Sequence, residues 1–162
     1  MTRASIILAD FAETDASGKV HMLGAGWSIT GPNTGPQAVA GFIQVPAAQS
    51  GSLIQFVLRL TDRSGEVVEA PGPAGMQRME VTGQVEMRAP EGWDGATDLN
   101  AAFAMNVVVP LPQGQPYTWS LEVDGKDLAS TTFYVRSNAP GSAEIVSSQK
   151  LPADDVELDD RS

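Results

Sequence analysis

The sequence predicts an all-β protein: an antiparallel β-sandwich, immunoglobulin-like or jelly-roll-like, of about eight strands, with a flexible acidic C-terminal tail. Two observations lead to this fold class. Apolar residues recur with a period of two, and the segments that carry them are separated by turns rich in glycine, proline, aspartate and asparagine, with no helical window between them. We therefore expect one sandwich domain over residues 1–136 and an extended tail over residues 137–162.

The strand signal is clearest over residues 78–88, where Met79, Val81, Val85 and Met87 alternate with polar residues and predict one buried and one wet face. The others share this alternation or are rich in the β-branched and aromatic residues that suit a pleated surface. In chain order, the predicted strands lie within residues 4–11, 19–30, 37–45, 53–62, 78–88, 101–109, 117–125 and 128–135.

The last two predicted strands flank the strongest turn signal in the chain. Asp124 and Gly125 can take the positive φ values that a two-residue hairpin turn requires. The segments on both sides are strand-like, so the sequence predicts a β-hairpin here. By contrast, the proline-rich stretch at residues 69–77 is expected to form a projecting loop, either a spacer or the tip of a contact.

The tail stands outside the strand pattern. From residue 137 onward it carries six carboxylates, two basic residues and few large aliphatic side chains, too few to offset the entropy cost of ordering it. Its Leu151, Val156 and Leu158 are spaced among carboxylates, as in a segment that orders only when it docks on a partner. The alternative is a solubilising tail that contacts nothing.

Composition excludes several classes of partner and chemistry. The 162 residues carry a net charge of -10, which repels nucleic-acid phosphates and anionic lipid headgroups. Cysteine is absent, so there are no disulfides, thiolate metal sites or cysteine nucleophiles. No signal peptide or transmembrane segment is evident, and we expect synthesis in the cytoplasm.

No cofactor, metal or catalytic site is predicted. His21 is the single histidine, and in mid-strand it is expected to be structural. The acids around Asp15, and the pair Asp94 and Asp98, lack the spacing of a calcium loop. Gly24 and Gly26 lack the third glycine and following helix of a dinucleotide site, and are expected to mark a bulge or a close approach of backbone. A paired-carboxylate hydrolase has no positive support.

The three tryptophans are the remaining candidates for recognition. Trp119 is expected in the core, and Trp27 in the core or as an edge plug. Trp93 lies in a glycine-rich loop beside Asp94, where it would either stack on a sugar ring or anchor a protein contact. The alternative is a lid over one open end of the sandwich.

The stretches "RASIILADFAETDASGKVHMLGAGWS", "AVAGFIQV" and "GQPYTWSLEVDGKDLASTTFYV" resemble a family of small proteins of unknown function from bacterial genomes and their phages. The resemblance covers residues 3–136 and leaves the tail outside. It implies a sandwich fold and carries over no site residues.

These observations favour a non-catalytic structural or interaction module that acts with a protein partner or assembly, such as an accessory decoration or tail-associated protein of a phage virion. A homo-oligomer is left open. The alternative is a bacterial module that binds carbohydrate or another small ligand through Trp93 and its loop.

Overall fold

The computed structural model describes residues 1–138, which form an all-β fold of two sheets and two additional hairpins. The three-stranded sheet has the order β1 (Arg3–Ala9), β5 (Pro36–Val45), β10 (Leu99–Val108). The five-stranded sheet has the order β4 (Ile29–Thr30), β12 (Lys126–Val135), β11 (Gln115–Val123), β6 (Leu53–Thr61), β9 (Glu80–Glu86). The hairpins pair β2 (Phe11–Thr14) with β3 (Val20–Leu23), and β7 (Glu69–Gly72) with β8 (Gly75–Arg78).

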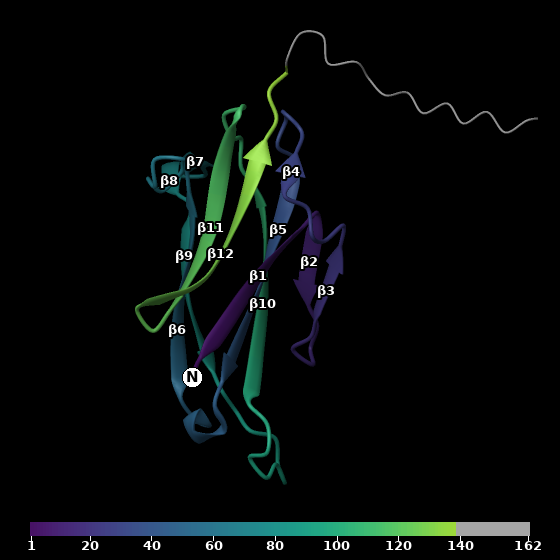
Figure 1. The fold of residues 1–162 in the computed structure, drawn as a ribbon, viewed down its shortest axis with the longest axis vertical. Helices are drawn as coiled ribbons and strands as arrows, with labels where there is room; N and C mark the ends of the chain where they lie inside the picture. Colours follow the sequence, from purple (N-terminus) through teal and green to yellow (C-terminus); the bar gives the residue numbers. More distant parts are fainter. Residues whose placement is uncertain (139–162) are drawn as a thin grey trace, which may run out of the picture.

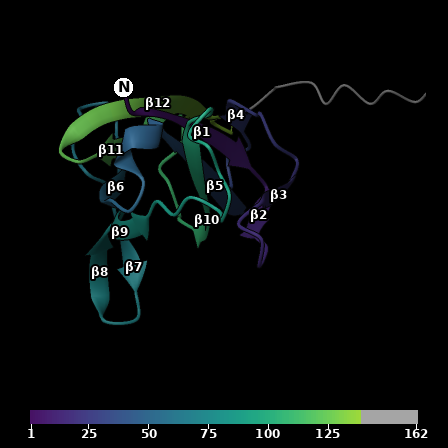
Figure 2. The same cartoon turned by 90° about the horizontal axis from the view of Figure 1, so that it is seen from below.

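The two sheets pack face to face as a sandwich (Figure 1). All described pairings are antiparallel except the short pairing of β4 with β12. One side is closed where β1 packs against β12 and β11. On the other side lie the edge strands β9 and β10, and the β7–β8 hairpin extends from this side (Figure 2). The β2–β3 hairpin lies instead on the outer face of the three-stranded sheet.

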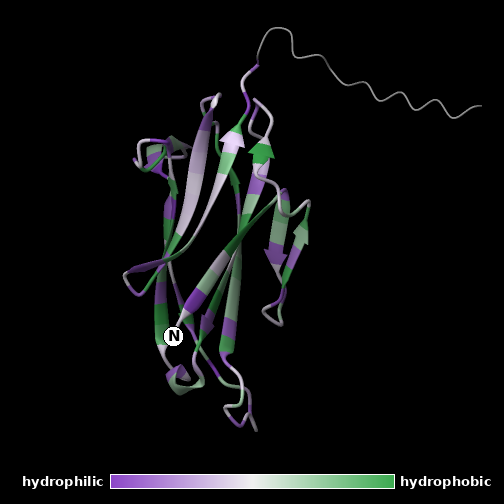
Figure 3. Ribbon diagram, viewed as in Figure 1, coloured by the Kyte–Doolittle hydropathy of each residue, from purple (hydrophilic) through white to green (hydrophobic). Residues whose placement is uncertain are grey.

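The core lies between the sheets, and strand β11 shows how the sequence builds it. Tyr117, Trp119, Leu121 and Val123 are all buried, while the residues between them lie on the outer face. Apolar and polar bands alternate along the strands in the same way (Figure 3). A side-chain period of two therefore directs every second residue of a strand into one continuous core.

The predicted all-β class, an antiparallel sandwich, is confirmed, and each of the eight predicted segments contains a strand. The predicted tail lies outside the described residues. The hairpin turn is also confirmed, because β11 pairs with β12 and the turn residues Asp124 and Gly125 have φ of 47° and 76°. The only helical element within residues 1–138 is a short 3-10 turn, Ala47–Gln49. No helix in this part of the chain has the length and apolarity that crossing a bilayer requires.

Three details differ from the expectations. The segment 19–30 divides into β3 and β4, and the proline-rich stretch forms the hairpin β7–β8 rather than a loop. Val81 was expected to be buried but is 41 % exposed. It lies on β9, at the edge of the five-stranded sheet, and the opposing sheet has only three strands to cover it.

Candidate functional site

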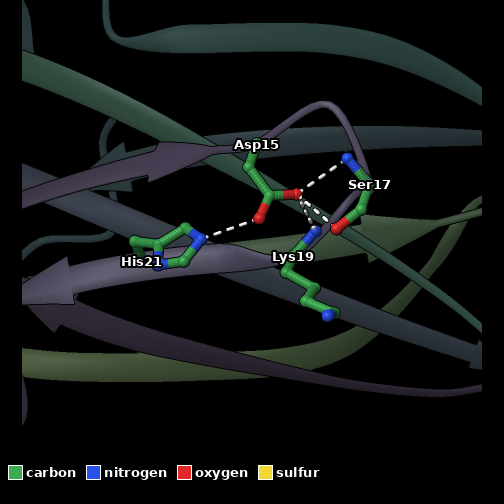
Figure 4. A network of polar contacts seen from close by, with 4 residues as sticks. All are labelled: Asp15, Ser17, Lys19 and His21. Carbon is green, nitrogen blue, oxygen red and sulfur yellow. Dashed lines mark hydrogen bonds and ion pairs between the residues drawn. The ribbon is translucent and has the colours of Figure 1, made fainter.

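The sole histidine belongs to a polar network at the turn between β2 and β3 (Figure 4). One oxygen of Asp15, Oδ1, accepts hydrogen bonds from the Ser17 hydroxyl at 2.6 Å and from the backbone N–H groups of Ser17 and Lys19 at 2.8 and 3.1 Å. The other oxygen, Oδ2, lies 2.8 Å from Nε2 of His21. The hydrogen bond from the Ser17 hydroxyl, followed by that of His21, holds the pKa of Asp15 far below its ordinary value of 3.8.

Serine, histidine and aspartate therefore meet here, but in the wrong order for nucleophilic catalysis. In a catalytic triad the histidine lies between the serine and the carboxylate and takes the serine proton. Here Asp15 lies in the middle, and the Ser17 hydroxyl donates to it rather than to His21. The network orients a turn and leaves this hydroxyl without a base.

A second turn shows that this arrangement does not need the histidine. Asp62 accepts hydrogen bonds from the Ser64 hydroxyl at 2.6 Å and from the N–H groups of Ser64 and Glu66 at 2.8 and 3.2 Å. The sequences of the two turns, DASGK and DRSGE, share the aspartate, serine and glycine. The pKa of Asp62 is likewise lowered, chiefly by the Ser64 hydroxyl. The shared residues are thus a turn motif, which supports a structural role for Asp15.

The other candidate acids serve separate local contacts. Asp94 accepts a hydrogen bond from the N–H of Ala96 at 2.9 Å, and Asp98 pairs with Arg3 at 3.3 Å. The side chain of Asp10 fills the space beside Gly24, whose φ of 61° suits glycine. This side chain, rather than backbone, makes the expected close approach to Gly24. Within residues 1–138, no three metal-binding side chains form a group that could hold an ion.

The tryptophans occupy distinct places. Trp119 is fully buried, and Trp27 packs edge-on against Phe133 with ring centroids 5.5 Å apart. Trp93 is half-buried against the core, and its indole N–H lies 3.4 Å from the Thr97 hydroxyl. Its loop therefore folds back on the sandwich. The tail candidates Leu151, Val156 and Leu158 lie outside the described residues.

The structure adds a feature that the sequence pattern did not indicate: the β2–β3 hairpin is fixed to the body by one side-chain amide. Asn106 on β10 accepts a hydrogen bond from the Ala12 N–H at 3.1 Å and donates one to the Ala12 carbonyl at 2.7 Å. It thus takes the place of a neighbouring strand. Beneath it, Ala12 is fully buried with Ala9 and Ala38.

The opposite face of this hairpin presents two apolar side chains to solvent. Phe11 and Leu23 are cross-strand partners and are 44 % and 68 % exposed. They alternate with Ala12 and Met22, which face the sheet. A strand period of two therefore places an apolar pair outward on a hairpin that is anchored inward.

Comparison with protein families matches residues 4–136 to DUF6941, a family of unknown function. The chain belongs to this family. Comparison with curated proteins finds no match. The resemblance to a family of unknown function is therefore confirmed, and the DUF6941 region coincides with the sandwich and its hairpins.

Within this DUF6941 domain, sequence reasoning selected Trp93 and Asp94 and missed Phe11, Leu23 and Asn106. A loop tryptophan is an obvious candidate because exposed aromatic residues often mark contacts. The sequence pattern instead places Phe11 at the end of the first predicted strand, within residues 4–11. The pairing that places it beside Leu23 links residues on two four-residue strands, which are too short to show alternation.

Proposed function

We propose that this DUF6941 domain is a non-catalytic interaction module that attaches to a larger protein assembly through the β2–β3 hairpin. The observation that carries the proposal is the exposed Phe11–Leu23 pair on a hairpin anchored by Asn106. Adjacent exposed apolar side chains mark contact sites, and a rigid support lowers the entropy cost of binding. We further propose that the domain has an immunoglobulin-like sandwich and serves as an accessory protein of a phage virion, either a decoration protein or a tail-associated protein.

The first test asks whether the native chain is part of a larger protein complex. In extracts of the source cells, size-exclusion chromatography should place the chain in a complex much larger than its own 17.0 kDa. Virions pelleted from the same cells should contain it. A chain that elutes alone would contradict the interaction module, and one found only in non-viral complexes would contradict the virion role.

The second test asks whether the hairpin makes the contact. The double variant Phe11→Ser, Leu23→Ser should bind the assembly at least about tenfold more weakly, since burying each side chain contributes about 1.5–3 kcal/mol. Leu53→Ser is the matched control, because Leu53 is 57 % exposed and lies on β6 of the other sheet. A hairpin variant that binds like the native chain would overturn the assignment of the contact.

A second candidate, the carbohydrate-binding module, is favoured by a separate observation. It concerns a hollow on the three-stranded sheet and does not involve Trp93.

A further inference from the structure

The outer face of the three-stranded sheet is only half covered. At one end of this face, Ala12 of the β2–β3 hairpin packs on Ala9 and Ala38. Towards the other end, the face forms a hollow of about 370 Å³, with Gly18 from the hairpin turn at its rim. A volume of this size lies within the range of about 300–1,000 Å³ that small-ligand sites occupy. We call it the Phe42 hollow, lined by Arg3, Ser5, Gly18, Phe42, Gln44, Asn100 and Ala102 with adjoining backbone.

Phe42 supplies an aromatic surface in the hollow. It lies on the central strand β5, paired with Ser5 of β1 on one side and Ala102 of β10 on the other. Both neighbours are small, so the ring keeps part of its surface exposed on the outer face of the sheet. An aromatic ring between small neighbours can receive a flat, weakly polar surface of a ligand.

A row of polar side chains crosses the sheet beside this ring. Arg3, Gln44 and Asn100 are register partners on the three strands and share the outer face with Phe42. The two amides can each donate and accept hydrogen bonds, and the guanidinium donates. The charge of Arg3 is offset by Asp98, 3.3 Å away. The hollow therefore combines an apolar surface with polar groups of little net charge.

Three classes of small ligand can be compared with this chemistry. A wholly apolar ligand would bury the amides without partners, which is costly. An anion would meet a guanidinium already paired with a carboxylate, on a chain of net charge -10. A neutral sugar fits both parts, because a pyranose ring has C–H groups on its faces and hydroxyls at its edge that donate and accept.

We propose that the Phe42 hollow binds a single pyranose unit of a neutral carbohydrate. Phe42 packs against the C–H face of the sugar, and Gln44 and Asn100 hydrogen-bond its hydroxyls, with Arg3 as a further donor. This site is separate from the Phe11–Leu23 pair, which lies on the solvent-facing side of the β2–β3 hairpin. It is also distinct from the Trp93 loop.

The experiment is saturation-transfer NMR on the full chain with four probes: the methyl glycosides of glucose, galactose and mannose, and N-acetylglucosamine. At least one should receive saturation, most strongly at its ring C–H protons. Phe42→Ala and Gln44→Ala should each raise its Kd by about tenfold or more. Circular dichroism and the thermal midpoint check that both variants remain folded. Ala102→Leu offers a second variant, which fills the hollow and should block binding without removing a polar group.

Matched controls separate this site from the others. Trp93→Ala and the double variant Phe11→Ser, Leu23→Ser should bind the sugar like the native chain, so the sugar site and the hairpin contact can fail independently. Absence of saturation transfer to all four probes would overturn the proposal. Sugar binding by Phe42→Ala equal to that of the native chain, or loss of sugar binding in Trp93→Ala, would also overturn it. So would tighter binding of glucuronic acid, an anionic sugar, than of the neutral methyl glucoside.

Discussion

One aspartate holds each of the two serine-containing turns, at residues 15–19 and 62–66. Asp15 and Asp62 each accept three hydrogen bonds at one oxygen, and the pKa of both carboxyls is lowered mainly by a serine hydroxyl. A carboxyl whose folded pKa lies below its unfolded value of 3.8 contributes stability that is fully present above that pH. The contribution is lost as the pH falls through the folded pKa.

We therefore predict that Asp62→Asn lowers the thermal midpoint at pH 7, and that the gap from the native chain narrows as the pH falls below 3.8. Differential scanning fluorimetry across this range measures the gap. Glu91→Gln, in the loop before β10, is the control, because it removes an exposed carboxylate that accepts no hydrogen bond from its own turn. A gap that stays constant or widens in acid would show that the ionised Asp62 does not stabilise the fold.

Two glycines make room for an aromatic stack between the sheets. Phe103 lies opposite Gly41, Phe56 lies opposite Gly83, and the two rings stack with centroids 4.5 Å apart. A Cβ at either glycine would overlap the ring of its partner. Gly41 and Gly83 are thus fixed by packing rather than by a positive φ.

Gly41→Ala is expected to lower the free energy of unfolding by about 1–3 kcal/mol, as overpacking in a core does. Gly35→Ala is the matched control, because a Cβ there meets no atom within 4 Å. It should change stability by no more than about 0.5 kcal/mol. Urea unfolding measures both, and equal effects would contradict the packing argument.

At the scale of elements, the side chain of Asn106 holds the β2–β3 hairpin to β10, whereas backbone hydrogen bonds hold β1, β5 and β10 together in their sheet. Asn106→Ala removes both hydrogen bonds to Ala12 and should cost about 1–3 kcal/mol locally. Hydrogen exchange of the backbone amides of β2 and β3 should become faster, while the backbone amides of β6 and β11 stay protected. Asn100→Ala on the same strand is the control. Unchanged exchange in the hairpin would show that the alanine packing holds it alone.

The difference between these elements explains what the sequence could predict. Long strands such as β6 and β11 can be predicted from the sequence, because apolar and polar residues alternate over nine positions and one face is buried. The strands β2, β4, β7 and β8 have two to four residues each, so no period is visible. The Phe42 hollow arises from register between residues about 40 and 60 positions apart, which no local pattern encodes.

At the scale of the whole molecule, the sandwich is closed on one side and open at the sheet edges on the other. β1 packs against β12 and β11, whereas the β7–β8 hairpin extends from the side where β9 and β10 are the edge strands (Figure 2). Exposed edges invite pairing with other chains, and projecting elements beside them restrict what can approach. The β2–β3 hairpin covers part of the outer face of the three-stranded sheet, and its exposed Phe11–Leu23 pair makes that face the one where we expect a partner.

A final prediction concerns how much of the chain this architecture needs. The core that the structure describes within residues 1–138 joins both sheets, and the DUF6941 match ends at residue 136. A chain truncated after Asn138 should therefore unfold in one transition, with a midpoint within a few degrees of the full chain. Scanning calorimetry of both proteins provides the comparison. A large fall in midpoint would mean that residues 139–162 contribute to the fold, and would replace the expected separate tail with an integral segment.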